Sequence, residues 1–284
     1  MNKLLLTLAA TVLAGAAAHA ADLPVRKAPP VVPVVVVPVP IWTGAFIGGS
    51  IGGAFGGNPG NEISGKNLYC IDTFCTSPTT PVSVVTGASS QSNSFVGGPQ
   101  IGYNYQMSPD FVMGGVLDFL WLNRSGSSSY SDSSTVRSWT ETRSFTDSFK
   151  QSWLATARLR VGPTFDQFWL YATGGVALGG LKSSSSSTTI WTSNGGPLVA
   201  ASGFGSTSGA AWGWTIGAGG EYKFSPNLSL FAEYLYYSLD KSYDVTVATN
   251  PLVTGTNISA TYRVKAQGDG HLIKLGLNYG FWTY

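Results

Sequence analysis

Eight stretches of this chain alternate between apolar and polar residues, and this period of two predicts β-strands. They are residues 41–56, 95–107, 111–122, 152–165, 168–181, 211–224, 228–238 and 271–284. Because successive side chains on a strand point to opposite faces, each strand has a mostly apolar face and a more polar face. The acidic and basic residues of these strands all fall on the more polar face: Asp118, Arg158, Arg160, Glu221, Lys223, Glu233 and Lys274. The pattern predicts an all-β fold.

The connections between these strands are of two kinds, which alternate along the chain. Residues 108–110, 166–167 and 225–227 are tight turns rich in turn-forming residues. The other connections have about 30 residues each and are dominated by Ser, Thr, Asn and Gly: 58–94, 123–151, 182–210 and 239–270. Short periplasmic turns and long extracellular loops are typical of outer-membrane barrels. The sequence therefore predicts an eight-stranded antiparallel up-and-down transmembrane β-barrel with long extracellular loops.

A soluble β-sandwich would show the same alternation, so other features must separate the two folds. Charged residues make up only 11% of the chain, against about 25% in an average soluble domain. Aromatic residues lie near both ends of apolar faces, as in Phe111 and Trp121 or Trp212 and Phe224, which suits the interfacial girdles of a membrane barrel. The mean hydropathy is only +0.12, which argues against a helical membrane protein with several long apolar runs.

The residues before the barrel divide into two segments. A basic start, an apolar run and small residues predict a secretory signal peptide over residues 1–20, with cleavage between Ala20 and Ala21. Residues 21–40 contain six prolines, which favour polyproline II and would form a semi-rigid periplasmic tether with a reach of roughly 60 Å. Residues 41–284 are then expected to form the barrel domain.

The charged face is expected to line the barrel interior, because the apolar face must meet lipid. An eight-stranded barrel is just wide enough for its interior side chains to fill it. Four basic and three acidic residues would then pair and close the lumen. The alternative is a narrow, charge-lined pore, since inward glycines would leave space for water: Gly48, Gly102, Gly114, Gly175 and Gly217.

Few residues suggest a catalytic or metal-binding site. Cys70 and Cys75 lie in the first long connection of an exported chain, where a local disulfide is more plausible than a metal-ligand pair. His271 is the single histidine after cleavage, and spacing indicates no acidic partner for a Ser–His arrangement. We therefore predict no catalytic residue, metal site or cofactor. The net charge is only +2, and the basic residues are spread along the chain and form no basic face. No nucleic-acid partner is therefore expected.

Four segments together resemble a known family. They are the mature start at residues 21–24, the opening strand at 41–49, the segment at 97–105 and the ending at 275–281. In this order they resemble the small outer-membrane β-barrel proteins of alphaproteobacteria, relatives of the OmpA-like barrel known as porin-family or outer-membrane immunogenic proteins. The resemblance implies an abundant envelope protein with an eight-stranded barrel and no enzyme activity.

The resemblance also carries expectations for both ends of the chain. In some members the mature Ala-Asp start is joined covalently to peptidoglycan, which here places the bond on the amine of Ala21, next to Asp22. The barrel-insertion machinery reads a terminal aromatic residue in the family, and this chain continues beyond Phe281. We therefore expect the insertion signal among Tyr279, Phe281 and Tyr284.

The predicted function is structural: an outer-membrane barrel that contributes to envelope integrity and surface display. A small porin or solute channel is the first alternative, and a surface receptor or adhesin acting through its loops is the second. The expected partners are outer-membrane lipid and lipopolysaccharide, the barrel-insertion machinery and peptidoglycan. A monomer is favoured over a trimer.

Overall fold

The computed structural model describes residues 41–57, 61–71, 74–76, 81–86, 90–136, 139–193, 196–250 and 256–282. These residues form twelve strands in one antiparallel sheet. The strands are β1 (Gly44–Phe55), β2 (Asn61–Ile71), β3 (Phe74–Thr76), β4 (Pro81–Thr86), β5 (Ser90–Gln91), β6 (Ser94–Ser108), β7 (Phe111–Val136), β8 (Trp139–Phe165), β9 (Phe168–Ser193), β10 (Gly196–Lys223), β11 (Leu228–Asn250) and β12 (Thr256–Trp282). Within these ranges no helix has the length and hydropathy needed to cross a bilayer.

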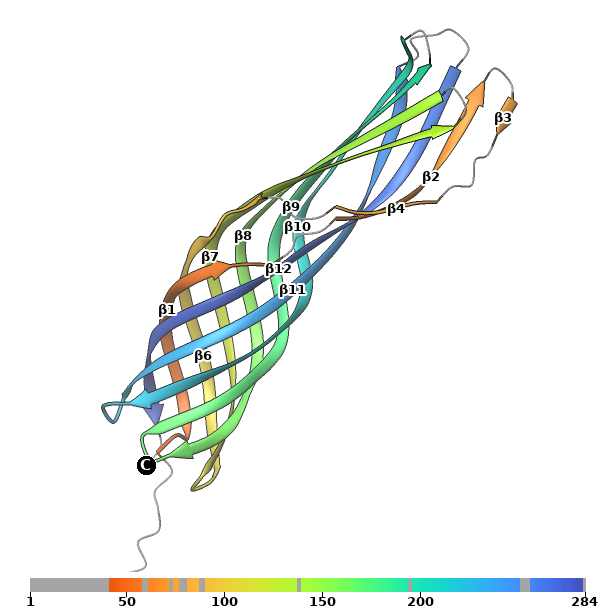
Figure 1. Cartoon of the computed structure of the whole chain (residues 1–284). Helices are drawn as coiled ribbons and strands as arrows, with labels where there is room; N and C mark the ends of the chain where they lie inside the picture. Colours follow the sequence, from red (N-terminus) through yellow and green to blue (C-terminus); the bar gives the residue numbers. More distant parts are fainter. Residues whose placement is uncertain are drawn as a thin grey trace, which may run out of the picture. The chain divides into compact units, whose positions relative to one another are not determined.

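Eight of the strands close into a ring. Figure 1 shows the barrel that they form. The order is β1, β6, β7, β8, β9, β10, β11 and β12, and β1 then pairs with β12 along its whole length. Consecutive strands of the ring are neighbours and all pairs are antiparallel. Closure leaves no unpaired edge in the membrane part of the sheet. The predicted eight-stranded up-and-down barrel is confirmed.

The two faces of the ring differ sharply in character. Large apolar side chains stand on its outer face, 37% exposed or more, because a membrane barrel presents this face to lipid. They include Ile47, Ile51, Ile101, Leu117, Leu159, Val176, Ile216, Leu230, Ile273, Leu275 and Leu277. Aromatic residues end the apolar belt on both sides, among them Trp121 and Trp212 toward the long connections and Phe165 and Phe281 toward the short turns.

Three of the four long connections are mostly strand. β7 to β12 are 23 to 28 residues long, whereas about 9 to 11 residues are enough to cross a bilayer. Residues 123–136 and 139–151 continue the β7–β8 ladder, and β9 pairs with β10 almost to their far ends. Side-chain burial alternates with a period of two along these parts of the strands, and cross-strand hydroxyl pairs support the ladder.

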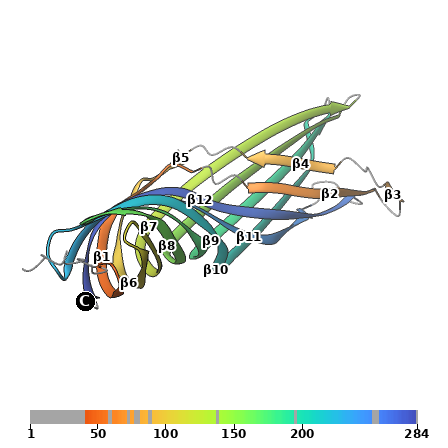
Figure 2. The same ribbon diagram turned by 90° about the horizontal axis from the view of Figure 1, so that it is seen from below.

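The first long connection also carries strands. β2 pairs with the far part of β12, and β4 pairs with β2. The short β5 pairs with β7. Figure 2 shows β2 and β4 running side by side. Together with the long strands, β2 and β4 form an extension of the sheet beyond the apolar belt, which we call the sheet extension (β2, β4 and the parts of β7–β12 past Trp121 and Trp212).

The first and last strands begin at other residues than the sequence predicts. The first strand begins at Gly44 rather than at residue 41, since Ile41 and Trp42 turn into the barrel mouth at the short-turn end. The last strand begins at Thr256, well before residue 271. Its outward face carries Tyr279 and Phe281, which are 46% and 56% exposed.

Candidate functional site

The barrel interior holds the charged residues that the sequence placed there, and β7 shows how it is layered. Starting from the short turn, the inward residues of β7 change from apolar to acidic and back to apolar: Val112, Gly114, Val116, Asp118, Leu120 and Leu122, followed by Arg124. The interior therefore has an apolar floor, a charged middle and an apolar cap, with a polar group above the cap.

Trp42 forms the floor. Its side chain is fully buried, and its ring lies 5.7 Å from that of Trp169. The indole Nε1 donates a hydrogen bond of 3.2 Å to the carbonyl of Asp166, which has a positive φ in the short turn. The backbone amide of Trp42 donates to Gln106 Oε1. Val112 and Tyr171 complete this cluster, so the segment that precedes β1 closes the short-turn mouth.

A quartet of two acids and two bases forms the middle of the barrel. Arg158 contacts Asp118 at 2.6 Å and Glu233 at 2.8 Å. Lys274 contacts the same two carboxylates at 2.6 and 3.1 Å. All four side chains are at most 2% exposed. Each charge thus has two opposite partners, which is the arrangement that buried charges require.

A second network lies between the quartet and the floor. Arg160 Nη1 is 3.3 Å from Glu221 Oε2, and its Nη2 donates to Asn104 Oδ1 at 3.0 Å. The Glu221 carboxylate also accepts hydrogen bonds from Asn278 Nδ2 and Ser229 Oγ. The guanidinium stands 4.7 Å above the ring of Phe46, and also near two floor rings. This network joins the charged middle to the aromatic floor.

Lys223 is the seventh charge, and it belongs to the floor. It is 5% exposed, and its ammonium group donates to the carbonyl of Ile41 and lies 5.0 Å from the ring of Trp42. It therefore holds the incoming segment in place. The structure brings the other six predicted interior charges together in ion pairs, as described above.

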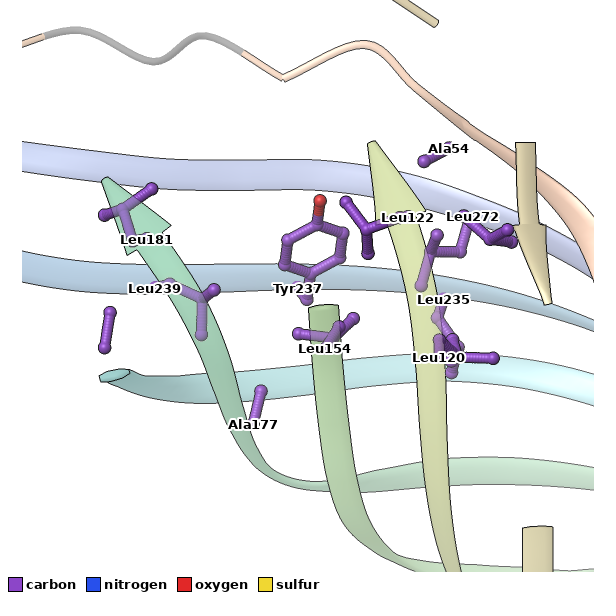
Figure 3. Close-up of a cluster of buried hydrophobic side chains, with 12 residues drawn as sticks. Ala54, Leu120, Leu122, Leu154, Ala177, Leu181, Leu235, Tyr237, Leu239 and Leu272 are labelled. Atoms are coloured by element: carbon purple, nitrogen blue, oxygen red, sulfur yellow. The ribbon is translucent and has the colours of Figure 1, made fainter. Parts of the chain in front are cut away.

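An apolar cap closes the interior on the side of the sheet extension. Its side chains come from many strands of the ring and pack together, as Figure 3 shows. The cap contains Ala54, Val96, Leu120, Leu122, Leu154, Ala177, Leu181, Ala211, Leu235, Tyr237, Leu239 and Leu272, all at most 5% exposed. Sequence reasoning missed this layer, although the apolar run from Phe119 to Leu122 shows that both faces of β7 are apolar there.

A polar group stands above the cap and was also missed. Arg124 is 1% exposed, and its Nη1 donates to Tyr237 Oη at 3.1 Å and to the carbonyl of Asp269 at 2.7 Å. Tyr237 Oη in turn donates to Gln151 Oε1 at 2.9 Å. Arg124 and Gln151 lay in segments that the sequence assigned to loops. Their burial follows from the strands that continue beyond the cap.

The space expected beside inward glycines is occupied. A methyl group added to Gly102 would collide with the ring of Phe46. At Gly48 and Gly114 it would meet the amide groups of Asn278 and Asn104. At Gly175 and Gly217 it would meet the backbone of the neighbouring strand. These glycines therefore allow close packing of the groups beside them.

The remaining predicted sites lie outside this interior. His271 is on the outer face, where its Nδ1 is 2.7 Å from Tyr234 Oη and its ring stacks with that of Phe55. Ala20, Ala21, Asp22 and Tyr284 lie outside the described residues. Among the residues that are described, no three His, Cys, Asp or Glu side chains cluster as metal ligands would.

The backbone register places Cys70 of β2 directly opposite Cys75 of β3. The disulfide stays a prediction, and a Cys70→Ser, Cys75→Ser variant tests its role. We expect this variant to insert and to keep heat-modifiable migration, because so small a closed loop contributes less than the roughly 3 kcal/mol of a 15-residue loop. Thiol titration of the oxidised wild type should find no free thiol. Loss of the barrel in the variant would contradict the prediction.

The comparisons with known proteins agree with this geometry. The family model described as "outer membrane protein beta-barrel domain" matches residues 6–281. The 31 kDa outer-membrane immunogenic proteins of Brucella melitensis biotype 1 and Brucella suis biovar 1 are each 32% identical over 194 residues. Each match covers 66% of this chain and 66% of the relative, so the chain spans just under two thirds of those proteins.

Solved structures of outer-membrane proteins are also similar to this chain. OprG from Pseudomonas aeruginosa is 14% identical, with a TM-score of 0.38 over 85% of this chain and 97% of OprG. Ail from Yersinia pestis is 13% identical, with a TM-score of 0.25 over 82% and 99% of the two chains. From the extent of the family match, the chain belongs to the outer membrane β-barrel protein family and is a protein of the outer membrane.

Proposed function

We propose that the protein is a closed structural barrel that contributes to envelope integrity and displays its sheet extension at the cell surface. The observation that carries the proposal is the layered interior, in which paired charges lie between the floor around Trp42 and the leucine-rich cap. Interior side chains that are packed and paired in this way stabilise the fold of the barrel. The proposal gives it no catalytic role.

The packed interior favours this function over a small porin. A pore of this width would need continuous polar walls wetted by water. Here the cap lies in the lumen, and its side chains Leu120, Leu154 and Leu272 are fully buried. Solute passage would require several layers to open together.

Surface display predicts opposite accessibility for the two ends of the barrel. Ser131 is exposed on the sheet extension and Asp110 is exposed in a short turn. In a chain with Cys70 and Cys75 replaced by serine, Ser131→Cys should react with a membrane-impermeant maleimide on intact cells. Asp110→Cys should react only after the outer membrane is opened. Labelling of Asp110→Cys alone on intact cells would reverse the topology.

Envelope integrity is tested in cells that lack the protein. We expect such cells to be more sensitive to detergent and to release more periplasmic protein than wild-type cells, because a stable barrel of the outer membrane is missing. Expression of the full chain should restore both properties. Unchanged sensitivity and leakage in the deletion would contradict a role in envelope integrity and leave surface display to be judged by the labelling above.

We also propose that the chain is tethered to peptidoglycan through Ala21. The supporting observation is the position of Trp42, which lies in the short-turn mouth at the start of the barrel domain. In the topology proposed above, this mouth faces the periplasm. Boiled sacculi digested with muramidase should release the protein with muropeptide mass on its amino-terminal peptide. Quantitative recovery of a free Ala21 amine would contradict the tether.

A further inference from the structure

Two lysines face each other on the outer side of the sheet extension. Lys150 of β8 and Lys182 of β9 are directly paired in the register, and serines flank them on both sides, so the row across four strands reads Ser125, Lys150, Lys182 and Ser208. Both lysines are exposed, and the adjacent residues Gln151 and Leu181 are buried in the interior. The ammonium groups therefore point away from the barrel.

This arrangement is unfavourable for the protein alone, because like charges directly opposite each other destabilise a sheet. Among the described residues, neither lysine side chain makes a hydrogen bond or an ion pair. Two other bases of the sheet extension differ: Arg263 pairs with Asp244 at 3.0 Å and Lys265 with Asp240 at 3.5 Å. The lysine pair thus offers two positive charges to a partner outside the chain.

The lysines line a surface cavity of about 330 Å³. Its other lining residues include hydroxyl side chains of three strands: Ser148, Ser184, Ser206 and Ser208. Ser148 Oγ and Ser184 Oγ are 2.8 Å apart. The cavity therefore combines positive charge with hydroxyl groups that donate and accept hydrogen bonds.

Further rows of hydroxyl groups lead away from the lysines along the same face. The next row contains Ser127, Ser148, Ser184 and Ser206, and a later one contains Ser131, Ser144, Thr188 and Ser202. Such rows suit a ligand that is itself rich in hydroxyl groups. A strand contributes an outward residue about every 7 Å, so the rows extend over several sugar lengths.

The lysine pair lies just above the apolar belt. Trp153 and its neighbour Trp121 belong to the aromatic girdle, and the register places Trp153 opposite Gly180, two residues before Lys182. Girdle residues mark the boundary between hydrocarbon and headgroups. The lysines accordingly lie at the headgroup level, with the hydroxyl rows beyond it.

We propose that this face of β7–β10 binds a phosphorylated glycolipid of the outer leaflet. Lys150 and Lys182 hold a phosphate group, since ammonium groups bind phosphate as point charges, and the serine rows contact the attached sugars. The inference rests on the surface-display topology proposed above. It goes beyond that topology, and beyond the lipopolysaccharide partner expected from the sequence, by assigning the residues that bind the phosphate and the sugars.

The test uses the full chain folded into phosphatidylcholine vesicles that contain a small fraction of bisphosphorylated lipid A. The lipid retained by the protein after mild detergent extraction is measured by native mass spectrometry. We expect Lys150→Ser/Lys182→Ser to bind lipid A about tenfold more weakly, the order of change for losing two exposed charge contacts. The control Arg263→Ser/Lys265→Ser removes the same charge from the same extension and should bind as the wild type does.

Other lipids and inorganic phosphate test which chemical group of the ligand the protein binds. Dephosphorylated lipid A should bind to the wild type as weakly as lipid A binds to the lysine variant, and inorganic phosphate should compete only poorly. Equal losses in both double variants, or equal binding of phosphatidylglycerol, would overturn the proposal. Because these vesicles carry lipid A in both leaflets, binding does not depend on orientation, and the maleimide labelling tests the topology separately.

Discussion

Replacing Arg158 with alanine is expected to lower the free energy of unfolding of the barrel by about 3 to 5 kcal/mol, the usual cost of removing one member of a buried charge group. Arg158 contacts both acids of the quartet, Asp118 and Glu233. Without it, Lys274 alone would face two carboxylates that are at most 2% exposed. The loss leaves the quartet with a net negative charge.

Asp132→Ala is the matched control, since Asp132 is exposed on the sheet extension. Its effect should stay within about 0.5 kcal/mol. Both variants are compared with the wild type by urea unfolding of the full chain in lipid vesicles, followed by heat-modifiable migration. Small and equal effects would mean that water screens the quartet, and the porin function would then be favoured.

Replacing Trp42 with alanine should have an effect of similar size, about 3 to 5 kcal/mol, because it removes a large buried aromatic side chain and leaves a cavity. The ring packs on Trp169 and lies beside the ammonium group of Lys223. Its removal also takes away the hydrogen bond to Asp166. The floor would lose the side chain that closes the short-turn mouth.

Trp42→Phe keeps an aromatic ring in the floor but loses the Nε1 bond and part of the buried ring volume. Its cost should therefore be smaller, about 1 to 2 kcal/mol. Urea unfolding in vesicles measures both variants. An alanine variant as stable as the phenylalanine variant would show that Trp42 does not hold the floor together.

Side-chain parity predicts the inward residues of the membrane part because the period of two is a local property of each strand. Glu221 and Lys274 are assigned in this way, and both are fully buried. Parity cannot say which charges meet, since Asp118 and Lys274 are 156 residues apart. Their contact depends on the register between strands and on closure of the ring.

Other parts of the fold could not be read from composition. Residues 182–193 contain five consecutive serines, and such runs are typical of loops, yet they form part of β9. What stabilises them is the ladder to β8 and β10, a non-local property. The alternation predicts that Trp42 belongs to a strand. In the structure its side chain instead packs inside the mouth of the barrel.

The closed interior is tested most directly by conductance. The purified full chain, inserted into planar lipid bilayers, should show no discrete current steps at voltages where a known porin conducts steadily. Heat-modifiable migration of the same sample confirms that the barrel is folded. Uniform, reproducible current steps from the folded wild type would contradict a lumen closed by its floor, charged middle and cap.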